Sequence, residues 1–384
     1  MELRSKRDSS QNAVSTDIVH VTGSLGGGVL TSIRLLCNYF ASNGFSVALV
    51  YSARDELYEG WEESFAESIQ LIPLEISREA NFGQDIANLS FLTKLFSELQ
   101  PKVVHLHSAK AGFTGRLAMR LSSADAAVFY SPRGWSFLQE DRSAVGRFIY
   151  LQLEKLGACL SGKVIACSQT EFDVCVEQVS KNAVLIENGI DVCAVPTRIP
   201  NSLEGESRAR LIGTVGRISP QKNPAAFLGV VKEFVGKNVK FVWIGDSFGA
   251  DDQNDKVQLL AAGVEVTGWL PRDEVLQRVS TFDVFLLMSK WEGMPLALIE
   301  SQVSGVVGVV SNIVGNKDIV SHGETGFIVN SSGEASAAIR QLVGNAELLE
   351  SMSLSARAES INRFSSERLG SEYSVVYGLA DSEG

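Results

Sequence analysis

Short apolar runs alternate with longer amphipathic stretches along most of the chain. The run Ile18–Thr22 predicts a buried strand, and the stretch Val29–Asn43 after it has the spacing of a helix that covers a sheet. The same pattern predicts further strands at Phe45–Tyr51, Lys102–Leu106, Ala126–Ser131, Lys163–Cys167, Leu211–Gly216 and Thr281–Met288. Regular alternation of strands and helices is typical of parallel, doubly wound sheets, so we predict an α/β fold.

A polar segment divides this pattern into two series. Residues 196–210 have the sequence PTRIPNSLEGESRAR and precede a new apolar strand. We therefore expect two Rossmann-like domains and their connections. The expected division is a disordered lead at 1–16, a first domain at 17–195, a linker at 196–210, a second domain at 211–365 and an amphipathic helix within 366–384. Ligands of such sheets bind beyond the carboxyl ends of the strands, so the predicted site is a cleft between the domains.

Two carboxylates flank a predicted helix start in the segment WEGMPLALIE, residues 291–300. Pro295 suits the first helical position, because its missing N–H has no helical acceptor there. Glu292 then lies in the preceding loop and Glu300 more than one turn inside the helix, and the helix N-terminus between them favours an anion. A nucleotide sugar fits this arrangement, since it carries hydroxyls at both ends and a diphosphate in the middle. The alternative is a surface glutamate and a paired helical glutamate without a ligand.

Two cations follow a glycine-ended strand in the segment GRISPQKNP, residues 216–224. Gly216 permits close backbone approach, and Asn223 can cap a helix that opens at Pro224. Arg217 and Lys222 can face one anion, because the guanidinium offers a planar fork and the ammonium a point charge. The alternative is a pair of solvated cations on a loop.

Four motifs occur in a characteristic order: GRISPQKNP, Ile244-Gly245-Asp246, Thr267-Gly268-Trp269 and EGMPLALIE. Together they resemble the donor half of retaining glycosyltransferases of family 4, which have the GT-B fold. The resemblance continues upstream at ENGID (187–191) and downstream at SHGETGF (321–327), so it covers nearly the whole chain. It implies two Rossmann-like domains that face a central cleft, and a final helix that returns to the first domain.

The resemblance also implies roles for single residues. Arg217 and Lys222 hold the donor diphosphate, Glu292 binds hydroxyls of the donor sugar, and Glu300 accepts hydrogen bonds from the ribose. The implied donor-binding residues are Gly27, Gly28, Gly216, Gly245, Trp269, Gly293, Met294, Pro295, Leu296 and Glu300. The implied catalytic residues are His107, Arg217, Lys222 and Glu292.

The loop GSLGGG (23–28) follows the first predicted strand. It differs from the Gly-x-Gly-x-x-Gly of dinucleotide-binding domains, which disfavours an NAD-dependent oxidoreductase. In the family this loop faces the donor diphosphate and the acceptor, whereas the simpler alternative is a tight turn. His107 ends a predicted strand and matches a family position near the reacting sugar, with helix capping as its alternative; His105 is expected in the core.

Basic and aromatic residues gather in residues 105–155, where seven Lys or Arg stand against four Asp or Glu in a chain of net charge −11. Such a composition, with Phe148 among the cations, suits an anionic membrane surface, although an ordinary solvated face is the alternative. HSAKAGFTGRLA followed by SPRGWSFL resembles family members that extend polyprenyl-diphosphate-linked sugars of O-antigen, capsule or exopolysaccharide. The expected acceptor and membrane residues are Lys110, Arg133, Trp135 and Phe137.

Composition narrows the remaining possibilities. The acidic balance argues against a nucleic-acid partner, and five cysteines without a Cys-x-x-Cys pair indicate free thiols in a reducing compartment. No apolar run reaches the roughly 18 residues that span a bilayer, and residues 1–16 contain no apolar signal core. We therefore expect a cytoplasmic protein at the inner face of the cytoplasmic membrane. No Asp-x-Asp motif precedes a strand end, so we expect no metal and no cofactor.

The main hypothesis is a hexosyltransferase. It moves a sugar from a nucleotide diphosphate donor, expected to be UDP-linked from family frequency, to a lipid-linked saccharide with retention. A sugar-nucleotide epimerase of GT-B-like fold is the alternative, and it needs acid/base carboxylates that the motifs do not supply. A non-enzymatic binding protein leaves Arg217, Lys222, Glu292 and Glu300 unexplained.

Overall fold

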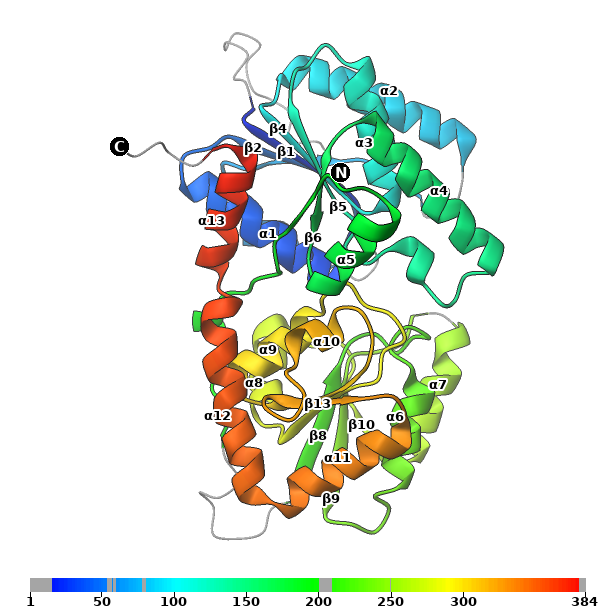
Figure 1. Ribbon diagram of the computed structural model, residues 1–384, viewed down its shortest axis with the longest axis vertical. Helices are drawn as coiled ribbons and strands as arrows, with labels where there is room; N and C mark the ends of the chain where they lie inside the picture. Colours follow the sequence, from blue (N-terminus) through cyan, green and yellow to red (C-terminus); the bar gives the residue numbers. More distant parts are fainter. Residues whose placement is uncertain are drawn as a thin grey trace.

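The chain forms two α/β domains, one above the other in Figure 1, in a computed structural model that describes residues 16–53, 57, 60–77, 81–199, 209–248 and 250–379. The predicted fold class, with two parallel sheets, is confirmed. The lead expected at residues 1–16 lies outside the described residues except for Thr16. This residue is buried, and its amide donates to the carbonyl of Leu99 at 3.2 Å.

The first domain contains a seven-stranded parallel sheet in the order β3-β2-β1-β4-β5-β6-β7. Its strands are β1 (Ile18–Leu25), β2 (Val47–Ala53), β3 (Gln70–Pro73), β4 (Val103–His107), β5 (Ala127–Ser131), β6 (Lys163–Ala166) and β7 (Ala183–Leu185). Its helices are α1 (Gly27–Ser42), α2 (Phe82–Leu99), α3 (Ala109–Leu121), α4 (Ala144–Leu160) and α5 (Gln169–Gln178), with short turns η1 (Trp61–Ser64), η2 (Ser136–Leu138) and η3 (Val192–Ala194). Ile18 and Val19 enter different apolar cores, because successive side chains of a strand point to opposite faces of the sheet.

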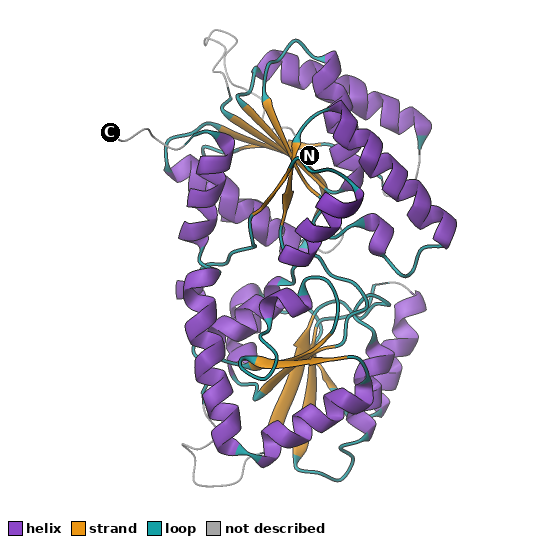
Figure 2. Cartoon of the chain, in the orientation of Figure 1, coloured by secondary structure: helices purple, strands orange, loops and turns teal. Residues whose placement is uncertain are grey.

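The second domain repeats this plan with a six-stranded parallel sheet in the order β10-β9-β8-β11-β12-β13. Its strands are β8 (Arg210–Val215), β9 (Val239–Ile244), β10 (Glu265–Val266), β11 (Val284–Leu287), β12 (Val307–Ser311) and β13 (Gly326–Val329). Its helices are α6 (Pro224–Lys232), α7 (Ala250–Ala261), α8 (Arg272–Ser280), α9 (Leu296–Ser304), α10 (Asn316–Ile319), α11 (Ser332–Gly344) and α12 (Ala346–Arg363). Figure 2 shows helices on both sides of each sheet, which explains why the side chains of the central strands are almost all buried on both faces.

The first strand and the first helix differ from their predicted bounds. β1 continues to Leu25 because its pairing with β2 resumes after a register shift that follows Thr22. α1 begins at Gly27 rather than Val29, so Gly27 and Gly28 form its first residues. β11 is shorter than predicted, because Thr281 and Phe282 complete the last turn after α8.

Residues 196–199, at the start of the expected linker, are fixed on the second domain. The amide of Arg198 donates to the carbonyl of Ser304 at 2.7 Å, and the Ser304 hydroxyl donates to the carbonyl of Pro196 at 2.7 Å. The Arg198 side chain is only 3% exposed and forms ion pairs with Asp283 at 3.3 Å and Glu350 at 3.2 Å. Residues 200–208 of this segment lie outside the described residues.

The chain passes between the domains at two neighbouring points. The amide of Ile190, on the outward crossing, donates to the carbonyl of Phe364, on the return crossing, at 2.8 Å. Arg363 pairs with Glu187 at 2.5 Å beside them. After the return, α13 (Ser366–Tyr377) packs against α1 of the first domain, as the red helix of Figure 1 shows.

Candidate active site

Two glycines lie at the carboxyl ends of β8 and β9, where the sequence predicts the second-domain half of the cleft. Gly216 has φ 144° and Gly245 has φ 136°, both in the region that side-chain-bearing residues avoid. A Cβ added to Gly245 would lie 2.3 Å from the carbonyl oxygen of Gly216. The indole of Trp243 donates to that same oxygen at 2.7 Å. The two strand ends therefore approach each other closely, and this contact fixes the loop that carries Arg217 and Lys222.

Lys222 and Glu292, which come from different loops, form an ion pair. The Nζ of Lys222 lies 2.6 Å from Oε1 of Glu292, and the two side chains are only 15% and 9% exposed. The Gln221 amide donates to Oε2 of Glu292 at 3.2 Å and to the carbonyl of Trp291 at 3.0 Å. The loop after β8 and the loop after β11 are thus joined into one polar surface.

The N-terminus of α9 lies next to this ion pair. The helix begins at Leu296, one residue later than predicted, because Pro295 has an extended ψ of 117° and stands at the N-cap. No side chain caps it, so the first amides of the helix have no acceptor within the helix. Met294 is buried, and its carbonyl accepts from the side-chain amide (Nδ2) of Asn188 of the first domain at 2.9 Å.

Glu300 lies inside α9 with a partner that the sequence did not indicate. The carboxylate is 6% exposed and its Oε1 lies 2.7 Å from Nη2 of Arg272, at the start of α8. Burial raises the pKa of Glu300, and the Arg272 and Arg34 cations oppose that shift. The sequence contains no signal for this pairing, because it depends on how α8 and α9 pack side by side.

Trp269 and Phe248 form an aromatic pair beside β9. Their ring centroids lie 5.0 Å apart with an interplanar angle of 32°, and Trp269 is 50% exposed. An isolated bridge between Gly245 and Gly268 brings the two segments together. Phe248 was not among the predicted residues. It follows Gly245 in the chain, and only the bridge from Gly245 to Gly268 brings it next to the Thr267-Gly268-Trp269 motif.

The N-terminus of α1 faces that of α9 from the first domain. Gly27 and Gly28 are exposed, and α1 has no side-chain cap. A Cβ added to Gly28 would lie 3.7 Å from the side chain of Leu296. Two helix N-termini, each with unpaired amides, therefore meet across the cleft.

The loop after β5 touches the loop after β11. A Cβ added to Gly293 would lie 2.8 Å from the amide nitrogen of Gly134 and 2.9 Å from the carbonyl carbon of Arg133. Glu171, which the motifs did not single out, holds this loop by accepting from the Gly134 amide at 2.8 Å. Arg133 adopts a left-handed backbone with φ 52°, which is uncommon outside glycine.

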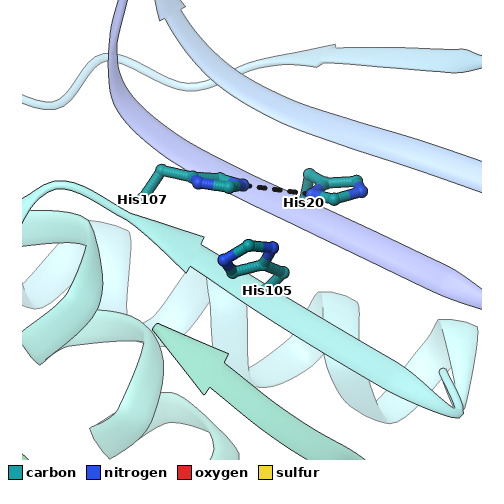
Figure 3. A group of neighbouring side chains, drawn as sticks. All are labelled: His20, His105 and His107. Atoms are coloured by element: carbon teal, nitrogen blue, oxygen red, sulfur yellow. Dashed lines mark hydrogen bonds between the residues drawn. The ribbon is translucent and has the colours of Figure 1, made fainter. Parts of the chain in front are cut away.

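His107 ends β4, as predicted, but it is fully buried together with His20 and His105 (Figure 3). Its Nδ1 accepts from Nε of Arg133 at 3.1 Å, so the neutral ring carries its proton on Nε2, which lies 3.1 Å from Nδ1 of His20. Burial, with the Arg133 cation nearby, lowers the pKa of His20 to about 3 and holds that of His107 well below its ordinary value. Both ring nitrogens of His107 therefore serve protein groups in this arrangement.

The three histidines are the group among the described residues whose ligand atoms could converge on a metal ion, all within 4.8 Å of one another. The arrangement does not suit a cation. His105 already bonds Tyr377 at 2.6 Å and Ser131 at 2.9 Å through its two nitrogens. The Arg133 guanidinium adjoins His107 and repels positive charge. In this arrangement the histidines belong to a hydrogen-bonded network with Tyr377, Ser131 and Arg133.

The expectation that Trp135 and Phe137 contact a membrane is wrong. Trp135 is 2% exposed and Phe137 7%, since η2 folds back and both rings join the core beneath α4. The Trp135 indole donates to the carbonyl of Glu171 at 3.2 Å. Lys110, from the same set, pairs with Asp85 of α2 at 2.8 Å. Within the described part of the chain, no helix has the length and hydropathy to cross a bilayer.

The sequence matches two families of known proteins, one in each domain. Residues 26–193 match "Glycosyltransferase Family 4", and residues 197–359 match "Glycosyl transferases group 1". Together the two matches cover most of both sheets.

Two relatives and one solved structure extend this result. The chain is 29% identical to the UDP-Gal:alpha-D-GlcNAc-diphosphoundecaprenol alpha-1,3-galactosyltransferase of Escherichia coli, over 75% of this chain and 78% of the relative. It is 26% identical to the capsular polysaccharide biosynthesis glycosyltransferase CapM of Staphylococcus aureus, over 83% and 87% of the two chains. Sucrose-phosphate synthase from Thermosynechococcus elongatus has the same fold, with a TM-score of 0.82, 16% identity, and coverage of 96% and 100%.

Proposed function

Because the chain belongs to the group 1 glycosyltransferases of family 4 and has the GT-B fold, we propose that it transfers a hexosyl residue from a nucleotide diphosphate sugar to a lipid-linked saccharide. The donor in this proposal is UDP-linked, the acceptor is polyprenyl-diphosphate-linked, and the product enters a bacterial surface polysaccharide. The names of the Escherichia coli and Staphylococcus aureus relatives support these assignments.

The ion pair between Lys222 and Glu292 carries the proposal. A sugar and a diphosphate are joined by one bond, so the groups that bind either side of that bond must adjoin each other. Lys222 and Glu292 lie 2.6 Å apart at the carboxyl edge of the second sheet. In the proposal Lys222 turns to the phosphate with Arg217, and Glu292 accepts from hydroxyls of the donor sugar.

The surrounding elements supply the rest of a donor site. The N-termini of α1 and α9, at Gly28 and Leu296, present amides to the diphosphate, and their dipoles stabilise its charge. Glu300 accepts from the ribose hydroxyls, and the Arg272 cation beside its carboxylate opposes the rise in pKa that burial causes. The exposed Trp269 ring offers a surface on which the base can stack.

The catalytic step in this proposal is electrostatic. Arg217, Lys222 and the two helix N-termini stabilise the charge that develops on the leaving phosphate, so no metal is needed for it. The acceptor hydroxyl attacks the anomeric carbon from the face that the phosphate leaves, the bond from this carbon to the phosphate oxygen breaks, and the leaving phosphate accepts the hydroxyl proton, so the new bond keeps the anomeric configuration of the donor. His107 contributes by holding the Arg133 guanidinium at the edge of the cleft, where Gly134 meets Gly293.

A lipid-linked acceptor is anchored in a membrane, so an enzyme that uses it must work at the membrane surface. We propose that it works at the inner face of the cytoplasmic membrane, bound peripherally, with the saccharide of the acceptor entering between the domains. The loop after β5, which carries Arg133, reaches that cleft from the first domain and provides a cation for the acceptor diphosphate.

A donor and acceptor screen tests the proposal. Purified protein is incubated with UDP-, GDP- and dTDP-sugars and with polyprenyl-diphosphate saccharides, with and without excess EDTA, and products are analysed by NMR. We expect transfer from one UDP-sugar, unchanged by EDTA, with an α-linked donor giving an α-linked product. A β-linked product would refute retention, and loss of activity in EDTA would refute metal independence. Formation of an epimer of the donor without acceptor would identify an epimerase instead.

A further inference from the structure

Helix α4 carries an uncovered apolar face. Val145, Phe148, Ile149, Leu153 and Leu156, here called the α4 face, have exposed fractions between 40% and 69%. Their spacing of three or four residues puts them on one side of the helix. Of the sixteen exposed large apolar side chains in the described residues, these five belong to a single helix. Scattered apolar residues need no explanation, but a continuous stripe of this kind marks an interaction surface.

The opposite side of α4 is anchored to the first domain. Glu154 is buried and accepts from the hydroxyl of Tyr130 at 2.7 Å, while the guanidinium of Arg116 lies 4.2 Å from the centre of the same ring. A Cβ added to Gly157 would come within 2.6 Å of Nη1 of Arg116. These contacts fix the rotation of the helix, so the α4 face cannot turn inward to bury itself.

The charges around the α4 face favour an anionic partner. Arg147 and Lys155 are exposed on the same helix, whereas its one acidic residue, Glu154, is buried. Arg142, just before the helix, lies over the ring of Tyr150 at 4.3 Å. The exposed Glu140 and Asp141 precede Arg142 and offset its charge. The excess of positive charge is therefore confined to the helix itself. An apolar stripe on a helix whose exposed charged residues are both cations, in a chain of net charge −11, matches the surface of an anionic bilayer.

The chain connection from the cleft to α4 relates the α4 face to the proposed site. The segment that begins with Arg133 and Gly134 at the cleft runs through η2 directly into α4, which lies at the outer edge of the first domain (Figure 1). We infer that the α4 face inserts into an anionic lipid bilayer and so presents the cleft to membrane-bound acceptors. The link to catalysis rests on the proposed lipid-linked acceptor, whereas binding to the bilayer does not.

Vesicle binding tests the inference without any acceptor. Sedimentation with phosphatidylglycerol-rich and with pure phosphatidylcholine vesicles compares the wild type with Phe148→Asp/Ile149→Asp and with Leu354→Asp. Leu354 is 62% exposed on α12 and serves as the matched control. Each methylene inserted into a bilayer contributes about fourfold to binding, so we expect the double variant to bind anionic vesicles at least about tenfold more weakly. The control should bind as the wild type does, and all three should melt alike.

Activity assays and the oligomeric state separate insertion into a bilayer from contact between two copies of the chain. Activity on a short-chain, water-soluble acceptor should be unchanged in the double variant, while activity on acceptor in vesicles should fall. Wild-type vesicle binding by the double variant overturns the inference. A wild-type dimer that the double variant converts to a monomer also overturns it, because the α4 face is then an interface between two copies. If the double variant loses vesicle binding but neither the wild type nor any variant transfers sugar to an acceptor, the proposed function is refuted, whereas the inferred contact with the bilayer is supported.

Discussion

Lys222 and Glu292 form an ion pair with each other, although the proposed function gives them different ligands. Each is largely removed from water, so an entering diphosphate replaces a carboxylate as the partner of a cation that is already desolvated. Exchange of one anionic partner for another costs less than desolvation of a free ammonium. In the proposed function, the pair therefore holds the cation in position for the donor diphosphate.

Replacement of Lys222 by alanine should remove one charge-assisted contact to phosphate, worth about 1.5–3 kcal/mol, and reduce turnover by about 10- to 150-fold. Arg217→Lys should cost less, since a positive charge remains. Lys290→Ala, which removes an exposed cation from the same pair of loops, serves as the control and should be near wild type. Steady-state kinetics measure the loss of turnover, and melting temperatures show whether each variant is folded. Near-normal turnover of Lys222→Ala would refute its role in binding phosphate.

Arg272 and Glu300 give a second prediction at the residue scale. Burial raises the pKa of Glu300 and Arg272 opposes that shift, so Arg272→Ala should raise this pKa further. A protonated carboxyl accepts less strongly from the ribose hydroxyls. Affinity for nucleoside diphosphate should therefore fall about tenfold or more, with a greater loss at pH 6 than at pH 8.

Calorimetric titration with UDP at both pH values measures this effect. Arg278→Ala is the matched control, because Arg278 is a more exposed arginine of the same helix that pairs with Glu265 instead. Equal affinity of wild type and Arg272→Ala at pH 6 would show that Arg272 does not support Glu300.

At the scale of single elements, most helices and strands could be predicted from the sequence, because the start and the burial of each element depend on residues within that element or next to it. Asn223 illustrates this. Asparagine before proline predicted the start of α6, and the Asn223 side chain indeed caps it by accepting from the amide of Ala226 at 3.3 Å. Apolar runs likewise predicted the central strands, because strands buried on both faces have a composition that helices and loops do not share.

What the sequence could not predict depends on contacts between elements. Trp135 and Phe137 lie among cations in the chain, yet η2 turns both rings into the core. Arg198 lies in a polar segment, yet it reaches a buried aspartate of the second domain. The partner of Glu300 on α8 is equally remote in the chain. Pattern and propensity describe one segment at a time and contain no information on which segments meet.

Asn223 also supplies a prediction for α6. Asn223→Ala removes the cap and places alanine at a left-handed φ of 55°, which should cost about 1–2 kcal/mol and lower the melting temperature by about 2–4 °C. Asn223→Gly should cost only a few tenths of a kcal/mol, because glycine adopts this backbone freely. Thermal unfolding followed by circular dichroism separates the two variants. A glycine variant less stable than the alanine variant would contradict this role of the cap.

At the scale of the whole molecule, the contact between Gly134 and Gly293 sets how closely the domains can approach. Gly293→Ala would bring a methyl group to 2.8 Å from the Gly134 amide nitrogen, so the two loops must separate. We expect turnover to fall at least about tenfold, because misplacement by about 1 Å can cost 100-fold. Affinity for free nucleotide should change less, because the proposed function assigns nucleotide binding mainly to residues of the second domain.

Turnover, calorimetry and small-angle X-ray scattering together test this prediction. Gly344→Ala is the control, since a Cβ at Gly344 meets nothing within 4 Å. The Gly293 variant should scatter as a slightly more open particle. Wild-type turnover with unchanged scattering would show that the loops need not touch during transfer.

The two neighbouring chain crossings, tied by the Ile190 amide and the Phe364 carbonyl, have a mechanical consequence. Two chain connections at almost the same point form a hinge: they allow one domain to rotate relative to the other, but they resist sliding of one domain past the other. A small rotation at the hinge becomes a large displacement at the opposite edge of the cleft, because displacement grows with distance from the axis. In the proposed function, rotation about this hinge would let donor and acceptor enter and leave, and closure would return the facing loops of Gly134 and Gly293 to the same register.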